Sequence, residues 1–143
     1  MNRFFKALGL LTLALCFPVS ADQQTVGDYV IHYQAFGSTF LTPSIAKAYG
    51  LQRSNYTGVV NISVLHANEK DSPGVPVEIT GVAKNLLDSS INLKFREIRE
   101  GKAVYYIAEV PYRNDETIHF QIGIKHGRQL NTTLKFKQSF FTD

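Results

Sequence analysis

Hydrophobic and polar residues alternate along most of the chain, which is the pattern of β-strands with one face on a core. The clearest run is residues 118–125, where four apolar residues alternate with polar residues or glycine. Similar runs predict seven strands in all, joined by short turns rich in glycine, asparagine, aspartate, serine or proline. The predicted strands cover residues 29–34, 58–66, 75–82, 90–99, 103–110, 118–125 and 130–140.

Seven short strands in about 120 residues are typical of an immunoglobulin-like β-sandwich. We therefore predict an all-β fold, an immunoglobulin-like seven-stranded antiparallel β-sandwich, with a small barrel as the alternative. Residues 103–110 are apolar on both faces, so this strand is predicted to be central. Residues 22–27 are polar and are expected to form a frayed lead-in.

One segment between the first two strands departs from the alternation and predicts a short helix in the first crossover. Thr42 can cap this helix, Pro43 suits its first position, and Gly50 predicts a left-handed stop. The connection over residues 36–56 is about 20 residues long, well beyond an ordinary hairpin, and long ordered loops often carry function. Its aromatic residues either cap the core or form a binding surface.

The crossover supplies the candidate binding residues of the predicted function. Aromatic side chains would contact a ligand, and neighbouring polar side chains would supply hydrogen bonds at the rim. These candidates are Phe36, Ser38, Thr39, Phe40 and Arg53.

The first 21 residues predict a cleavable signal peptide that forms a helix before the sandwich. Arg3 and Lys6 precede an apolar run of about 11 residues, and Val19-Ser20-Ala21 fits the small-residue cleavage pattern. The apolar run is shorter than the ~20 residues that span a bilayer, so we expect no membrane span after cleavage. The predicted organisation is a signal peptide over 1–21, a single domain over 22–143, and a periplasmic location.

Composition narrows the chemistry of the predicted domain. Cys16 is the only cysteine, and it falls in the signal peptide; a lipoprotein signal is the alternative, but Leu15 stands where a small residue is expected. The remaining chain would then have neither disulfides nor thiolate metal sites. Lys and Arg number 15 against 12 Asp and Glu, and removing Arg3 and Lys6 leaves 13 against 12. This near balance gives no reason to expect a nucleic acid partner.

Residues 36–43 (FGSTFLTP), followed by residues 48–51 (AYGL), carry a family resemblance. The chain resembles a gammaproteobacterial family of secreted or periplasmic proteins, a domain of unknown function with an FxSTFLTP segment before YGL. The resemblance covers the whole predicted domain and implies a periplasmic protein of a Gram-negative bacterium. It implies no activity.

No cofactor is predicted, and neither a GxSxG elbow nor an HExxH motif occurs. The predicted function is therefore a periplasmic, non-catalytic binding or interaction domain whose partner is an envelope protein or a small ligand. A periplasmic metal-handling protein is the alternative, with His32, His119 and His126 as its ligands. An envelope hydrolase is a third possibility, which would require carboxylates such as Glu69 and Glu78 to converge.

Overall fold

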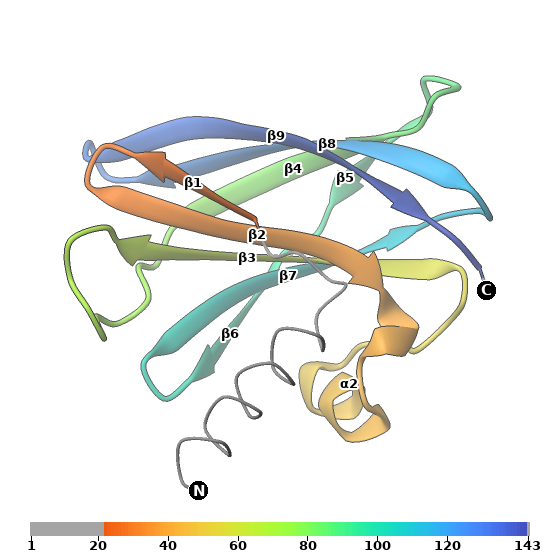
Figure 1. The fold of residues 1–143 in the computed structure, drawn as a ribbon, viewed down its shortest axis with the longest axis horizontal. Helices are drawn as coiled ribbons and strands as arrows, with labels where there is room; N and C mark the ends of the chain where they lie inside the picture. The colour runs from red at the N-terminus through yellow and green to blue at the C-terminus, as the bar shows by residue number, and fades with distance from the viewer. Residues whose placement is uncertain (1–21, 143) are drawn as a thin grey trace, which may run out of the picture.

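The protein folds into two antiparallel β-sheets packed face to face, seen in a computed structural model that describes residues 22–142 (Figure 1). The predicted signal peptide lies outside the described residues. A five-stranded sheet has the order β1-β2-β3-β7-β6, and a four-stranded sheet has the order β5-β4-β8-β9. The strands are β1 Asp22–Val26, β2 Tyr29–Gly37, β3 Thr57–His66, β4 Glu78–Lys84, β5 Ser90–Leu93, β6 Arg96–Glu100, β7 Ala103–Pro111, β8 Glu116–His126 and β9 Leu130–Phe140.

The strand order identifies the sandwich as immunoglobulin-like. Strands β2, β3, β7 and β6 take the places of A, B, E and D, and β5, β4, β8 and β9 take those of C′, C, F and G. The predicted fold class is therefore confirmed, including the short helix α2 (Pro43–Tyr49) in the first crossover. The number of strands differs from the prediction, because the described residues form nine strands instead of seven.

The first additional strand is β1, in the segment expected to be a frayed lead-in. Gly27 has a φ of +57° and turns the chain back, so that β1 pairs antiparallel with β2 from Asp22 opposite Tyr33 to Val26 opposite Tyr29. Pairing at an edge needs only backbone groups, and polar side chains are well suited to an exposed edge. A search for alternating apolar residues therefore cannot predict such a strand.

The second additional strand arises because the predicted strand over residues 90–99 divides at Lys94 and Phe95. Strand β5 pairs with β4 in one sheet, whereas β6 pairs with β7 in the other. Leu93 and Phe95 both pack into the space between the sheets, so the period of two continues across the break. The chain changes sheets without changing the direction of its apolar side chains.

The predicted strand over residues 75–82 begins later than expected, at Glu78. Val75 still pairs locally, since its N–H donates to Val64 O over 2.8 Å. Pro76 has no N–H to donate, and the N–H of Val77 donates to the hydroxyl of Tyr106 over 2.9 Å instead of to a strand. Residues 75–77 are therefore an extended entry to β4.

The core has two parts, one between the sheets and one outside the five-stranded sheet. The first contains the inward-facing residues of both sheets, with Ile31, Ile62, Val64, Ile122 and Leu134 almost completely buried. The second lies where the crossover covers the outer face of β3 and β7. Strand β7 is consequently buried on both faces and lies between β3 and β6, which confirms its predicted central position.

Candidate functional site

The crossover from β2 to β3 begins with the 3-10 turn η1 (Ser38–Phe40), which Ser38 anchors from inside. Ser38 is completely buried. Its hydroxyl accepts a hydrogen bond from Ser54 N over 2.8 Å and donates one to Ser54 O over 3.0 Å. This single side chain thus joins the start of the crossover to its end, 16 residues later.

Arg53 holds the same loop from the solvent side. Its Nε donates to Leu41 O over 2.8 Å and its Nη2 donates to Thr39 O over 3.1 Å. The structure brings Ser38, Thr39 and Arg53 into one loop, and their hydrogen bonds are with the crossover itself. They stabilise its shape and leave the hydroxyl of Ser38 inaccessible to a ligand.

Helix α2 has the ends that its sequence predicts. The Thr42 side chain accepts a hydrogen bond from Ile45 N over 3.2 Å, and Gly50 adopts a φ of +70°. The N–H of Leu51 then donates to Ala46 O over 2.8 Å. Leu51 and Ala46 are both buried in the outer part of the core, so the stop places the helix against the sheet.

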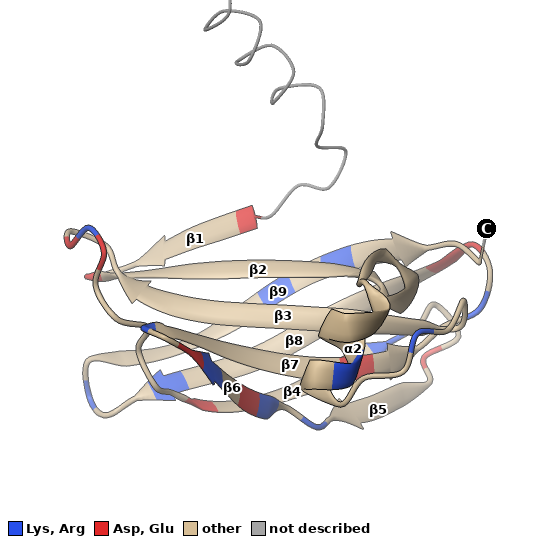
Figure 2. Cartoon of the chain, turned by 90° about the horizontal axis from the view of Figure 1, so that it is seen from below, with Lys and Arg blue, Asp and Glu red and all other residues tan. Residues whose placement is uncertain are grey.

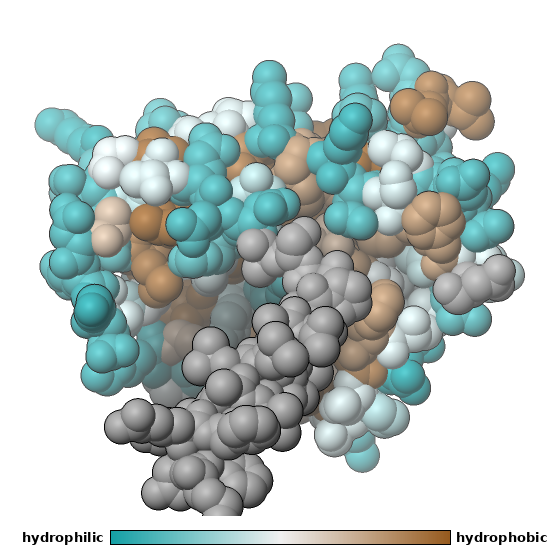
Figure 3. Space-filling view, viewed as in Figure 1, coloured by the Kyte–Doolittle hydropathy of each residue, from teal (hydrophilic) through white to brown (hydrophobic). Residues whose placement is uncertain are grey.

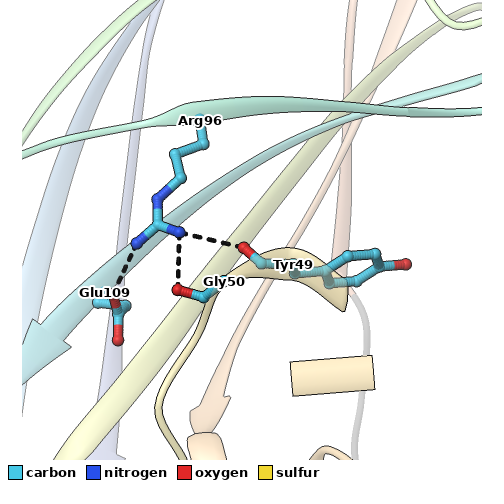
Figure 4. A network of polar contacts seen from close by, with 4 residues as sticks. All are labelled: Tyr49, Gly50, Arg96 and Glu109. Atoms are coloured by element: carbon cyan, nitrogen blue, oxygen red, sulfur yellow. Dashed lines mark hydrogen bonds and ion pairs between the residues drawn. The ribbon is translucent and has the colours of Figure 1, made fainter. Parts of the chain in front are cut away.

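A polar network docks the C-terminal end of α2 onto β6 and β7 (Figure 4). Arg96 Nη1 donates to the carbonyl oxygens of Tyr49 and Gly50 over 3.1 and 2.8 Å, and its Nη2 donates to Glu109 Oε1 over 2.9 Å. Tyr49 in turn donates its hydroxyl hydrogen to Glu100. This hydrogen bond, together with partial burial, raises the pKa of Tyr49 to about 12.

The two predicted aromatic contacts, Phe36 and Phe40, differ in their surroundings. Phe36 is half-buried and packs against the outer part of the core. Phe40 is 72 % exposed. Of the five predicted binding residues, Phe40 therefore presents the largest apolar surface to solvent, and the others support it.

Phe40 belongs to an exposed apolar cluster that sequence reasoning did not assemble. It lies at the end of the sandwich where β2, β4, β7 and β9 finish, which we call the crossover end. Six exposed large apolar side chains gather there, and we call them the crossover-end patch: Phe40, Tyr56, Leu86, Leu87, Ile91 and Phe141. Figure 3 shows apolar atoms protruding over the β4–β5 loop at this end.

A cleft of about 440 Å³ opens within the crossover-end patch. Tyr56, Leu87, Ile91 and Tyr112 supply its apolar walls, and Arg113 lies at its rim. Burial raises the pKa of Tyr112, whose hydroxyl donates to Phe141 O over 3.2 Å. The cleft therefore has apolar walls, and Lys84, Asn85, Ser89 and Glu116 line it together with Arg113.

The signal for part of this patch was present in the sequence. Leu86 and Leu87 are consecutive apolar residues in the connection between the predicted strands over residues 75–82 and 90–99, and they are 76 % and 81 % exposed. Turns are ordinarily polar, and exposed consecutive apolar residues are unfavourable unless they have a function. Their proximity to Phe40 and Phe141 depends on the tertiary fold, and no local pattern reveals it.

The histidines of the metal alternative do not converge. His32 lies on the outer face of the five-stranded sheet opposite Ser63, whereas His119 lies on the outer face of the four-stranded sheet. His126 is at the far end of β8, where its Nδ1 is 2.8 Å from Pro76 O. Within residues 22–142, no group of three or more His, Cys, Asp or Glu side chains could hold a metal ion.

The hydrolase possibility rests on scattered groups. Glu69 lies in the β3–β4 loop and Glu78 begins β4 opposite Lys125. Ser44 and Lys47 of α2 have Ser-x-x-Lys spacing, but the hydrogen-bond contact of Ser44 is with the Thr42 hydroxyl, at 3.3 Å. Within residues 22–142, Ser44 therefore forms no hydrogen bond with Lys47 or with a carboxylate.

Residues 22–142 thus form an immunoglobulin-like sandwich whose crossover end presents an apolar patch and cleft. A family model described as a domain of unknown function, DUF4426, matches residues 23–143. The chain belongs to this DUF4426 family, which confirms the resemblance to a gammaproteobacterial family of unknown function.

Solved structures share the fold. A crystal structure of a DUF4426 family protein from Pseudomonas aeruginosa is 34 % identical, with a TM-score of 0.74, and the match covers 86 % of this chain and 96 % of that one. FetP of uropathogenic Escherichia coli, expressed recombinantly in the periplasm, is 8 % identical, with a TM-score of 0.59 and coverages of 87 % and 95 %. The copper-reconstituted P19 protein from Campylobacter jejuni is 6 % identical, with a TM-score of 0.54 and coverages of 84 % and 93 %. The last two likenesses show the fold alone.

No protein of curated function has a sequence that matches this chain. Among the helices within residues 22–142, none is long and apolar enough to cross a membrane.

Proposed function

We propose that this protein is an exported, non-catalytic binding domain that captures an envelope protein at its crossover end. The observation that carries the proposal is the crossover-end patch, which contains six of the seven large hydrophobic side chains that are exposed among the described residues. Ile45 of α2 is the seventh. A random scatter of exposed apolar residues needs no explanation, whereas a cluster of them at one end does.

The size of the patch suits a specific interface. Its six side chains expose roughly 600 Å² of apolar surface, at about 150 Å² for each fully exposed large side chain. This is near the upper limit for the largest patch on a typical soluble monomer. A stable protein interface buries about 800 Å² on each partner, so the patch could form the centre of one.

The cleft and its rim indicate the chemistry of the partner. The apolar walls fit one large aliphatic or aromatic side chain. The guanidinium group of Arg113 forms no ion pair within residues 22–142. The backbone N–H of Arg113 donates to Glu116 Oε1 over 3.1 Å. A peptide segment with an apolar side chain next to a carboxylate would complement both features.

The crossover provides a firm support for such an interface. Hydrogen bonds from Ser38, Arg53 and Arg96 hold the backbone of the crossover. The loop that carries Phe40 would therefore lose little conformational freedom on binding. Preorganisation of this kind favours affinity, because less entropy is lost when a partner docks. Export is supported by the N-terminal pattern of positive, apolar and small residues.

Site-specific photo-crosslinking in the periplasm tests the proposal. A photoreactive residue at Leu87 or Tyr56 should crosslink to one protein, and the same residue at Lys102, at the opposite end, should not. In the double variant Leu86→Ser/Leu87→Ser, the yield of the crosslink from Tyr56 should fall at least tenfold. A tenfold decrease corresponds to a loss of about 1.4 kcal/mol of binding energy. Its unfolding midpoint should stay close to that of the unmodified protein.

Two outcomes would contradict the proposal. Crosslinks of equal yield from both ends would mean that the crossover end is not a specific interface. Loss of folding in parallel with loss of crosslinking would make the patch a part of the core.

A periplasmic metal-handling function is the second candidate, since a FetP variant and P19 with this fold were solved with copper. For this chain, His32 and His119 would have to act separately because they lie on opposite outer faces. Elemental analysis of the purified protein distinguishes the two functions. One copper or zinc ion per chain would support metal handling, and a content far below that would dismiss it.

A further inference from the structure

The outer face of the four-stranded sheet gathers basic side chains that are distant in sequence. Lys84, His119 and Lys137 form one row across β4, β8 and β9, because Lys84 pairs with His119 and His119 pairs with Lys137. Lys135 faces the same way in the next row, opposite Gln121. With strands about 4.8 Å apart and alternate residues about 6.8 Å apart, these side chains start within roughly 12 Å of one another. Figure 2 shows the blue bands of this set on β9.

Little negative charge balances this row. Three ion pairs occur within residues 22–142, and one of them involves the row. In this pair Lys84 Nζ is 3.4 Å from Asp88 Oδ1, and both groups are largely exposed. Glu78 lies at the far end of the face opposite Lys125, and Glu116 lies at the crossover end. The centre of the face is therefore positive, although the charges outside the predicted signal peptide nearly cancel, with 13 Lys and Arg against 12 Asp and Glu.

The same face is hollow, and both polar and apolar groups line it. One hollow of about 560 Å³ is lined by Lys84, His119, Gln121, Lys135 and Lys137, together with the apolar residues Val82, Phe120 and Phe136. A second hollow shares Val82 and Gln121 and continues toward Thr80, Asn92 and Thr133. Gly123 keeps its floor low, since a Cβ there would approach Thr80 Oγ1 to 3.3 Å. Ammonium groups thus occupy one half of the face, and amide and hydroxyl groups occupy the other.

We infer that this face binds a free sugar phosphate, a ligand that joins an oxyanion to several hydroxyl groups. The lysines would hold the phosphate as point charges. Asn92, Gln121 and Thr133 offer both donors and acceptors, which hydroxyl groups need. An anionic membrane fits less well, because none of the exposed large hydrophobic side chains of residues 22–142 lies among the residues of this face. The inference is independent of the proposed crossover-end interface.

Titration of the purified domain with glucose 6-phosphate at low salt tests the inference. Glucose alone and inorganic phosphate alone are the control ligands, since each represents one half of the sugar phosphate. NMR should show saturable shifts of the backbone amides of Gln121, Gly123 and Thr133. Glucose 6-phosphate should bind at least tenfold more tightly than either half. The double variant Lys135→Gln/Lys137→Gln should weaken binding at least tenfold.

Two further variants separate charge from folding. Gln121→Glu places a carboxylate of nearly the same shape at the centre of the face, and it should weaken binding as strongly as the loss of both lysines. Lys47→Gln removes an exposed lysine from α2, away from this face, and should leave the affinity unchanged. All variants should keep the unfolding midpoint of the original protein.

Three results would overturn the inference. These are no saturable binding at millimolar glucose 6-phosphate, equal affinity of the double lysine variant, and equal affinity for inorganic phosphate alone. Binding to phosphatidylglycerol vesicles without binding to the free sugar phosphate would also overturn it and assign the face to a membrane surface.

Discussion

Replacing Ser38 with alanine should loosen the crossover as a unit, because one buried hydroxyl joins its two ends. The substitution removes the hydrogen bond accepted from Ser54 N and the one donated to Ser54 O. Each such bond contributes about 1 kcal/mol net, and a buried N–H left without a partner costs about 1–3 kcal/mol. The structure therefore predicts a loss of about 2 kcal/mol in the free energy of unfolding.

For a domain of about 120 residues, 1 kcal/mol corresponds to about 4 °C in the unfolding midpoint, so Ser38→Ala should lower it by about 8 °C. Thr39→Ala is the matched control. Thr39 is the exposed neighbour, and its contact with Arg53 uses the backbone carbonyl, which alanine keeps. This control should stay within about 0.5 kcal/mol of the original protein.

Urea unfolding measures the free-energy change, and hydrogen exchange of the Ser54 amide locates it. Exchange at Ser54 should accelerate more than exchange in the central strands, because the crossover can open locally before the sheets separate. A Ser38→Ala protein as stable as the Thr39→Ala control would refute this reasoning. Unchanged protection of the Ser54 amide would do the same, since it would show that the two bonds do not hold the loop.

Two further predictions concern the docking of α2. Arg96→Lys should lower the free energy of unfolding by about 1 kcal/mol. An ammonium group cannot contact two carbonyl oxygens and Glu109 at the same time, as the forked guanidinium group does. A free energy of unfolding in urea equal to that of the original protein would contradict this prediction. Tyr49 has a pKa of about 12 in the folded state, above its ordinary value of 10.0. The stability contributed by the protonated hydroxyl of Tyr49 is therefore complete below pH 10 and is lost as the pH rises through 12. The stability difference between the original protein and Tyr49→Phe should therefore shrink between pH 10 and pH 12 in urea unfolding, and a difference that stays constant would show that the Glu100 contact is unimportant.

Much of the fold could be predicted from the sequence because its signals are local. The alternation within β8 and the capping residues Thr42 and Gly50 act within a few residues, and both are confirmed. The division of residues 90–99 could not be predicted in this way. Leu93 and Phe95 point into the same core from strands of different sheets, so hydrophobic alternation is the same whether the chain continues in one sheet or crosses to the other.

The candidate surfaces were less predictable because they depend on tertiary proximity. The sequence pattern predicted the crossover that carries Phe40 as a candidate surface, but Leu87 and Phe141 lie near it only where the ends of three strands meet. The basic face has the same origin. Lys84 and Lys137 are 53 positions apart in sequence, and the near-zero balance of charges conceals their row, because a net charge carries no information on where the charges lie.

The distribution of polar and apolar groups in the crossover favours an interface over a simple plug of the core. A plug would direct Phe40 inward and leave Ser38 in water, since a buried aromatic ring stabilises a fold more than a buried hydroxyl does. The crossover does the reverse: Ser38 is completely buried, and Phe40 is 72 % exposed. The exposed ring of Phe40 therefore adds little burial to the isolated domain, and a partner that covers Phe40 would supply it. Lys84 lines both the apolar cleft and the basic hollow, so a protein docked at the crossover end would lie directly beside any anion bound on the sheet face.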